Sequence, residues 1–321
     1  MRKRDRIKEI FEVFISALED FEPEKIRDIL AEDVFAEFST IGTYHNADDF
    51  INALAWKGPK MNVSRQHILN FVCRTNGSVA QQSAYVMALT GIDDGKFLYS
   101  FEYGGKYVVS YTEIDGEWKI SAIKYDLDWE KGNTAFAKGW KLLDYKLYAG
   151  HRAMICSEFD SPWAVIPEND EELTDEEQII ENMFKYSFGL DNCDFSLHHQ
   201  SYTDDVVFYA GDKVMEASAR HLINNFKNTA HKEHALEHAI KIVDIEINGD
   251  EAVLYGYRVE PHRLGSKNLN RDTMHQSFYS AKYKNLLRKV DGHWKMYELH
   301  YQPGVFFEID EEKKHYIDNL S

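Results

Sequence analysis

Apolar residues recur at helical spacing in two separate parts of the chain, and each set marks one face of a predicted helix. The two sets are Ile10, Phe11, Phe14 and Leu18, and Ile179, Ile180, Met183, Phe184 and Leu190. Both patterns continue through a second short helix to an acidic pair and a valine that open a strand, Glu32-Asp33-Val34 and Asp204-Asp205-Val206. Because residues 19–33 align with residues 191–205 without a gap, the chain contains an internal repeat.

Alternating patterns further along predict strands in both halves. A strand that begins with a histidine, His67 or His238, runs into an Asn-Gly pair, which is the strongest short signal for a hairpin. Three more strands follow in each half, at residues 79–89, 106–114 and 118–127 and at residues 252–259, 277–288 and 294–301. Helices followed by a run of antiparallel strands are typical of an α+β fold.

Cap and turn residues mark the ends of these elements. Thr174 is a candidate N-cap, because Glu177 follows three residues later. Asp115-Gly116 and Asp291-Gly292 predict tight turns before the final strands. We interpret Gly104-Gly105 as a hairpin turn before the third strand of the first half.

Length and charge narrow the class of protein. The chain has 321 residues, of which 44% are hydrophobic, so it is long enough for two packed domains. A net charge of −17 disfavours nucleic acid and anionic membranes as partners, since both are bound by basic surfaces. The three cysteines are well separated and form no CxxC pair, which favours a cytoplasmic location.

The order of elements, the His strand that leads to Asn-Gly, and the closing Gly-x-Trp-Lys resemble the nuclear transport factor 2-like superfamily, in its SnoaL-like branch. The resemblance covers the chain twice, over residues 1–130 and 172–308. It implies a tandem pair of cone-shaped α+β barrels, each a curved antiparallel sheet wrapped on helices. We expect a SnoaL-like domain at 1–130, an aromatic extension and solvated acidic linker at 131–173, and a second SnoaL-like domain at 174–321. The two domains would pair within one chain, and further homo-oligomer formation stays open.

The same resemblance implies candidate site residues in the second half. SnoaL-like dehydratases and isomerases place an Asp on the first helix, often with a Tyr before it, and histidines on facing strands. The matching residues of the second half are Tyr186, Asp191, Tyr209, His238, His262 and His300. The corresponding positions of the first half hold Phe14, Glu19, Glu37, His67, Thr90 and Lys124, so the first half resembles a degenerate copy.

These residue types suit general acid–base chemistry without a cofactor. Removing a proton next to a carbonyl and expelling a hydroxide requires a base with a pKa near neutral and an acid beside it. The catalytic candidates are Asp191, His238, His262 and Tyr186, and the substrate-binding candidates are Tyr209, His300 and Tyr257. Asp191 and His238 form the expected dyad. The expected substrate is a small hydrophobic molecule that carries a hydroxyl group, such as a steroid, polyketide or aromatic compound.

Other functions stay open. The same residues suit an isomerase that binds an enolate through Tyr hydroxyls, and the fold also suits a non-catalytic small-molecule-binding protein. The segment His234-Ala-Leu-Glu237-His238 spells the inverted zinc-protease motif. That motif needs a helix, whereas the repeat places His238 at the start of a strand, so we expect no metal site.

Overall fold

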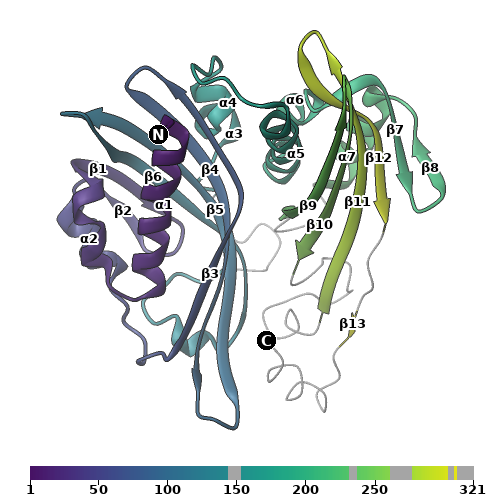
Figure 1. Ribbon diagram of the computed structural model, residues 1–321. Coiled ribbons are helices and arrows are strands. Elements are labelled where there is room, and N and C mark those ends of the chain that lie inside the picture. Colours follow the sequence, from purple (N-terminus) through teal and green to yellow (C-terminus); the bar gives the residue numbers. More distant parts are fainter. Residues whose placement is uncertain (144–152, 231–236, 261–276, 303–306, 309–321) are drawn as a thin grey trace. The chain divides into compact units, whose positions relative to one another are not determined.

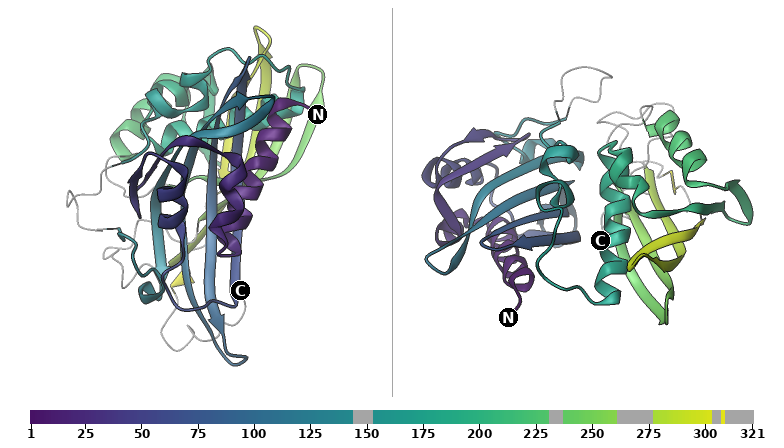
Figure 2. Two further views of the ribbon diagram at one scale, coloured as in Figure 1. Left: turned by 90° about the vertical axis from the view of Figure 1, so that its left-hand side faces the viewer. Right: turned by 90° about the horizontal axis from the view of Figure 1, so that it is seen from above.

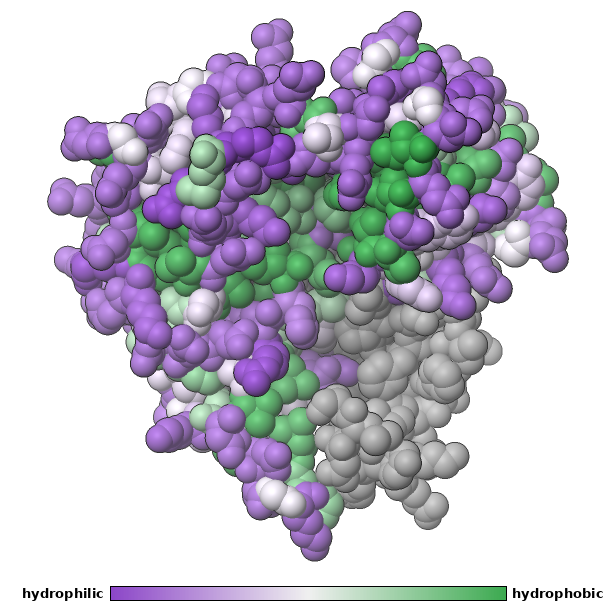
Figure 3. Space-filling model, viewed as in Figure 1, coloured by the Kyte–Doolittle hydropathy of each residue, from purple (hydrophilic) through white to green (hydrophobic). Residues whose placement is uncertain are grey.

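The chain folds into two compact units, Met1–Glu171 and Glu172–Glu308, which are described one at a time. The computed structural model in Figure 1 describes residues 1–143, 153–230, 237–260, 277–302 and 307–308. No helix in these ranges is both long and apolar enough to cross a membrane. The face drawn in Figure 3 is mostly hydrophilic, as expected for a chain with 28% charged residues.

The first unit is a six-stranded sheet with its two long helices on one face (Figure 1). The sheet order is β2-β1-β6-β5-β4-β3, in which β3 to β6 form an antiparallel meander and β1 pairs parallel with β6. The helices are α1 (Lys3–Glu19), the 3₁₀ helix η1 (Pro23–Ile29), α2 (Ala47–Leu54), the 3₁₀ helix η2 (Thr134–Phe136), α3 (Ser157–Asp160) and α4 (Pro162–Val165). The strands are β1 (Leu30–Phe38), β2 (Gly42–Tyr44), β3 (Val63–Asn76), β4 (Val79–Asp93), β5 (Leu98–Ile114) and β6 (Glu117–Gly132).

The second unit repeats this plan, with the sheet order β8-β7-β12-β11-β10-β9 and a parallel pair between β7 and β12. Its helices are α5 (Asp175–Asp191), α6 (Phe195–His199) and α7 (Ala219–Ala230), and α5 packs along β9 and β12 (Figure 2). Its strands are β7 (Tyr202–Ala210), β8 (Lys213–Glu216), β9 (Ala239–Asn248), β10 (Glu251–Glu260), β11 (Ser277–Val290) and β12 (His293–Gln302), and the short β13 (Phe307–Glu308) pairs with β11. The α+β prediction and the tandem repeat are confirmed. Both sheets are mixed and open, because within the described residues their outer strands do not pair with each other.

The predicted apolar stripe of the first helix forms the core of the first unit. Phe11 and Phe14 of α1 are fully buried, and their ring centroids lie 5.6 and 6.0 Å from that of Tyr107 on β5. Each fully buried phenyl group contributes about 2 kcal/mol relative to an exposed one. Packing of this stripe therefore holds α1 against the inner face of the sheet.

The interpretation of Gly104-Gly105 as a turn is wrong, because both residues lie inside β5. The pairing register shifts between them, as in a β-bulge. A Cβ atom on Gly104 would lie 2.3 Å from the Trp129 indole, and one on Gly105 would lie 2.2 Å from the carbonyl oxygen of Asp126. The two glycines therefore serve close packing against β6, and the hairpin turn lies further back, around Gly95.

The acidic segment after residue 167 is bonded to the first unit, which differs from the solvated linker that we expected. Asp170 accepts hydrogen bonds from the Gly77 backbone N–H at 2.8 Å and from Lys3 Nζ at 2.7 Å. Burial raises the pKa of Asp170, but the hydrogen bonds from Lys3, Thr75 and Gly77 outweigh it and lower the pKa to about 2. These contacts fix the segment to α1 and to the β3–β4 hairpin.

Candidate active site

Local sequence sets both ends of the helix that carries the acid. At the start of α5, Thr174 Oγ1 accepts a hydrogen bond from the Glu177 N–H at 3.2 Å, and the Glu177 carboxylate accepts one from the Thr174 N–H at 3.0 Å. This reciprocal capping box confirms the predicted N-cap. Asp191 is the last residue of α5, so its carboxylate is held at the end of a buried helix.

Asp191 and His238 form a buried hydrogen-bonded pair. His238 lies directly before β9, and its Nδ1 is 2.5 Å from Asp191 Oδ1. The backbone N–H of His238 also donates to Asp191 Oδ2, at 2.6 Å. The Asp191 side chain is 0% exposed and that of His238 is 6% exposed, so the pair lies inside the second unit.

This geometry sets the proton position on the imidazole. A carboxylate accepts hydrogen bonds, so Nδ1 of His238 carries a proton that it shares with Asp191. In the neutral ring Nε2 is then the basic nitrogen. The pair therefore has the arrangement of a general base oriented by a carboxylate.

Tyr186, one and a half turns before Asp191 on α5, contacts this pair. Its ring centroid is 5.9 Å from that of His238, with the ring planes at 86°. Burial, followed by the neighbouring Tyr283 and Tyr202, raises the pKa of Tyr186 well above its usual value. The phenol therefore keeps its proton near neutral pH, and it shares a hydrogen bond with the side chain of Tyr283.

His198 is a buried residue of this site that the sequence did not reveal. Its Nδ1 lies 2.8 Å from the Tyr186 carbonyl oxygen, and its Nε2 lies 3.2 Å from the Tyr202 hydroxyl. Burial lowers the pKa of His198 to about 3, so the ring is neutral. Gly189 permits this contact, because a Cβ atom there would lie 2.6 Å from the His198 backbone nitrogen. In the sequence, only the glycine within the predicted helix, Gly189, indicated that another segment packs closely against α5 at this point.

Aromatic rings surround the pair on the inner face of the second sheet. Tyr186 is 6.3 Å from Tyr283, which is 5.7 Å from Tyr301, and Tyr301 is 6.4 Å from Phe208. Phe208 in turn is 6.3 Å from Phe226 of α7. The interior of the second unit therefore holds a carboxylate, an imidazole and a phenol together with other aromatic rings and with the buried side chains of Glu237 and Arg258.

The other predicted residues do not join this group. Tyr209 and His300 are paired positions on β7 and β12, and their rings stack at 4.4 Å, with His300 Nε2 2.7 Å from Glu298. Side chains alternate along a strand, and the buried neighbour Leu299 faces inward, so His300 faces the outer side of the sheet. Tyr257 is 43% exposed and lines an outer groove together with His300. His262 lies outside the described residues.

The first unit has the same backbone contact with different side chains. The carboxylate of Glu19, the last residue of α1, accepts the Gln66 backbone N–H at 2.9 Å, as Asp191 accepts that of His238. Gln66 is therefore the structural counterpart of His238. The proposed match of His67 to His238 is wrong, because His67 is exposed on the neighbouring position of β3.

Metal-ligating groups do not cluster in the part of the chain that the structure describes. No set of three or more His, Cys, Asp or Glu side chains there could hold a metal ion. His231 and His234 lie outside the described residues, whereas His238 uses its Nδ1 to bond Asp191.

The fold and the site define a tandem α+β protein whose second unit carries a buried Asp–His pair. The model of the SnoaL-like domain family matches residues 1–124 and 171–300. The chain therefore belongs to the SnoaL-like domain family and contains two copies of the domain. No curated protein sequence matches it significantly.

Several solved structures resemble single stretches of the chain. A candidate scytalone dehydratase from Novosphingobium aromaticivorans is 15% identical, with a TM-score of 0.36, over 40% of this chain and 86% of its own. A hexachlorocyclohexane dehydrochlorinase, LinA-type3, from Novosphingobium barchaimii is 19% identical, with a TM-score of 0.34, over 40% and 89%. The Kfla4162 protein from Kribbella flavida is 16% identical, with a TM-score of 0.37, over 42% and 96%.

Proposed function

We propose that the second unit is a cofactor-independent dehydratase that acts on a hydroxylated, apolar small molecule. The observation that carries this proposal is the buried hydrogen bond between Asp191 and His238, with Tyr186 in contact. A carboxylate-oriented imidazole is a competent general base, and the aromatic surroundings favour an apolar substrate such as a steroid, polyketide or aromatic compound.

The proposed reaction is an elimination of water next to a carbonyl. His238 Nε2 takes a proton from the carbon beside the carbonyl, and the electron pair moves to the carbonyl oxygen to form an enolate. Asp191 stabilises the resulting imidazolium, and the Tyr186 hydroxyl donates a hydrogen bond to the enolate oxygen. The enolate then expels the hydroxyl from the next carbon, which leaves as water after taking a proton back from His238, directly or through His262.

The same first step also serves an isomerase. A substrate without a hydroxyl in that position would form the same enolate and receive the proton at another carbon. The two reactions differ only in the leaving group, so the products distinguish them. A binding protein without turnover would give neither product.

Proton exchange in D₂O tests the first step with any ketone that fits the site. A panel of bicyclic β-hydroxyketones is incubated with the full chain, with exchange followed by NMR and loss of water by mass spectrometry. Asp191→Asn and His238→Ala should each slow exchange about 10²–10⁴-fold, since they remove the base or its orienting group.

His293→Ala is the matched control, because His293 is an exposed histidine of the same unit. This variant should exchange at the normal rate, and thermal melting should show all three variants folded. Near-normal exchange in both the Asp191 and His238 variants would overturn the assignment. Exchange without loss of water, followed by a shifted double bond, would favour the isomerase.

A further inference from the structure

The contact between the first two helices of the second unit contains polar side chains that the fold does not require. α6 packs against α5 there (Figure 1), and the side chains at the contact are Tyr186 on α5, His198 on α6 and Tyr202 at the start of β7. They are exposed by 3%, 0% and 2%. Burying polar groups costs free energy unless they are hydrogen-bonded, so a set of three at one contact needs an explanation.

The first unit builds the same contact from apolar residues. When the gap-free alignment of the two copies is extended back along the first helix, the three positions hold Phe14, Ile26 and Leu30. All three are buried. The fold therefore forms without the polar set, which occurs only in the copy that also holds the Asp191–His238 pair.

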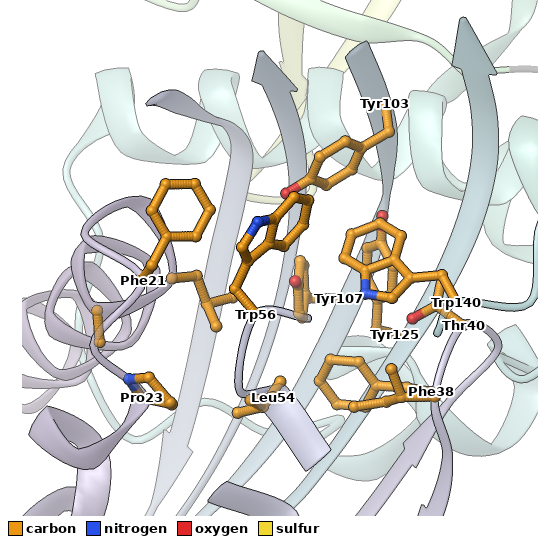
Figure 4. A pocket seen from close by; sticks show the side chains of 13 residues that line it. Phe21, Pro23, Phe38, Thr40, Leu54, Trp56, Tyr103, Tyr107, Tyr125 and Trp140 are labelled. Atoms are coloured by element: carbon orange, nitrogen blue, oxygen red, sulfur yellow. The ribbon is translucent and has the colours of Figure 1, made fainter. Parts of the chain in front are cut away.

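The pocket of the first unit shows the same difference. It lies at the end of α1, next to α2 and the inner face of the sheet, and Figure 4 shows the side chains that line it. Tyr107, which pairs with Tyr125 as Tyr283 pairs with Tyr301, is one of them. None of the described side chains that line it is charged or a histidine. A pocket in this fold therefore does not require a buried histidine either.

The hydrogen bonds of His198 have a fixed direction. Burial keeps the ring neutral by lowering its pKa, so one ring nitrogen donates and the other accepts. Nδ1 lies 2.8 Å from the carbonyl oxygen of Tyr186, which can only accept, so Nδ1 carries the proton. Nε2 then accepts from the Tyr202 hydroxyl, 3.2 Å away. His198 thus donates into α5 and accepts from β7.

The bond from His198 enters the part of α5 that carries the candidate catalytic groups. The Tyr186 carbonyl lies one and a half turns before Asp191, the last residue of the helix. The ring of Tyr186 also lies 4.9 Å from that of His198 and 6.1 Å from that of Tyr202. Gly189, in the same part of the helix, permits this approach, although a glycine inside a helix costs about 1 kcal/mol relative to alanine. A displacement of about 1 Å in a catalytic group can lower a rate about 10²-fold, so the position of this turn matters for chemistry.

We propose that His198 is a positioning residue of the active site, because its bond to the Tyr186 carbonyl fixes the part of α5 that carries Tyr186 and ends at Asp191. His198 acts through this turn and does not touch the substrate. The inference rests on the proposed function of the second unit, in which Tyr186 and Asp191 act at the substrate and at His238. It also gives a reason for a polar set that the first unit lacks.

Two double variants isolate this one hydrogen bond. His198→Leu/Tyr202→Phe and His198→Asn/Tyr202→Phe both remove the Tyr202 hydroxyl, so neither leaves it buried without a partner. Leucine and asparagine have nearly the same shape, but only asparagine can donate to the Tyr186 carbonyl. We expect kcat for proton exchange to fall about 10-fold in the leucine variant with KM little changed, and the asparagine variant to recover most of the rate.

The measurement uses the full chain in D₂O and the β-hydroxyketone that the unmodified chain exchanges fastest, accompanied by thermal melting. The leucine variant should be at least as stable as the asparagine variant, because apolar side chains fill the same contact in the first unit. A lower kcat in the leucine variant then does not follow from lost stability. His199→Asn is the matched control, since His199 is the exposed neighbour at the end of α6, and it should exchange at the normal rate.

Equal kcat in the leucine and asparagine variants, whether normal or reduced, would overturn the role of His198. His238→Ala separates that result from a failure of the proposed function. Slow exchange in His238→Ala together with equal rates in the two double variants rejects only the positioning role. Normal exchange in His238→Ala rejects the proposed function, and the positioning role with it.

Discussion

The two copies place a carboxylate at the same point and surround it differently. In both, the last residue of the first helix accepts a backbone N–H, from Gln66 of β3 at 2.9 Å for Glu19 and from His238, directly before β9, at 2.6 Å for Asp191. Only in the second copy does the donor residue also offer an imidazole. The carboxylate thus has a structural task in both units, namely to tie the helix end to the strand.

This difference indicates the residue on which the proposed catalysis depends. The described side chains that line the pocket of the first copy are uncharged, and the residue that donates to Glu19 is Gln66. The second copy has His238 at the same point, within contact of Tyr186. Since the carboxylate is common to both, the histidine is the group on which the proposed catalysis depends.

The largest expected effect comes from making the second copy like the first. His238→Gln keeps the backbone bond to Asp191 and removes the base, so proton exchange should fall about 10²–10⁴-fold with little change in melting temperature. The reciprocal Gln66→His should give no exchange in the first unit, because Phe14 stands where the second unit has Tyr186. Normal exchange in His238→Gln, measured by NMR in D₂O, would contradict the assignment.

A second difference concerns the contact between the first two helices of each copy, which in the second unit are α5 and α6. Gly189 and His198 of the second unit correspond to Ala17 and Ile26 of the first. Between pH 6.5 and 5, acid should destabilise the second unit more than the first. The folded-state pKa of His198 is about 3, below the usual value of 6.5, so the unfolded chain binds the proton first. Stability therefore falls as the pH drops from 6.5 towards 3, by up to ~1.4 kcal/mol per pH unit.

Hydrogen exchange of core amides in each unit at several pH values measures this loss. The amides of α5 should lose protection from pH 6.5 to 5 more steeply than those of α1. His198→Asn, whose amide can still donate to the Tyr186 carbonyl, should flatten the profile of α5. An unchanged slope in this variant would show that other groups cause the acid loss.

The sequence predicted the dyad but not its surroundings, for identifiable reasons. The Asp191–His238 pair followed from the resemblance to SnoaL-like dehydratases and isomerases, which place an Asp on the first helix and histidines on facing strands. His300 was misjudged as facing the dyad because strand alternation was not applied, although Leu299 and Tyr301 on either side indicate the inward positions. The error at His67 arose from matching the two histidines by residue type. The spacing from Asn76 to Asn248 equals that from Gln66 to His238, so the aligned strands match Gln66 to His238.

Other features depend on contacts that no local pattern encodes. Gly104-Gly105 has the composition of a turn, but the indole of Trp129 in the adjacent strand occupies the space that side chains would need. The neutral state of His198 results from burial among rings that come from distant segments. Both depend on tertiary packing, which overrides local propensity.

A moderate effect should follow from filling the space at the helix crossing. Gly189→Ala places a methyl group 2.6 Å from the His198 backbone nitrogen, and such overpacking costs about 1–3 kcal/mol. Ala17→Gly in the first unit should cost only about 1 kcal/mol, mainly through helix propensity. Amide exchange within each unit separates the two effects, since the chain need not unfold as one unit. Equal protection of the α5 amides from exchange in Gly189→Ala and in the unmodified chain would contradict the close contact between Gly189 and His198.

The smallest effect concerns how each first helix begins. The side chain of Thr174 caps α5. The residue before α1 is Arg2, whose side chain makes no cap. Instead, the backbone N–H groups of Lys3 and Arg4 donate to the carboxylate of Glu171, at 2.5 and 3.1 Å. Thr174→Ala should therefore destabilise the start of α5 by about 1 kcal/mol, and Arg2→Ala should change α1 by less than about 0.5 kcal/mol. Exchange rates of the first-turn amides measure both. Unchanged exchange at the start of α5 in Thr174→Ala would mean that the local cap of α5 is dispensable.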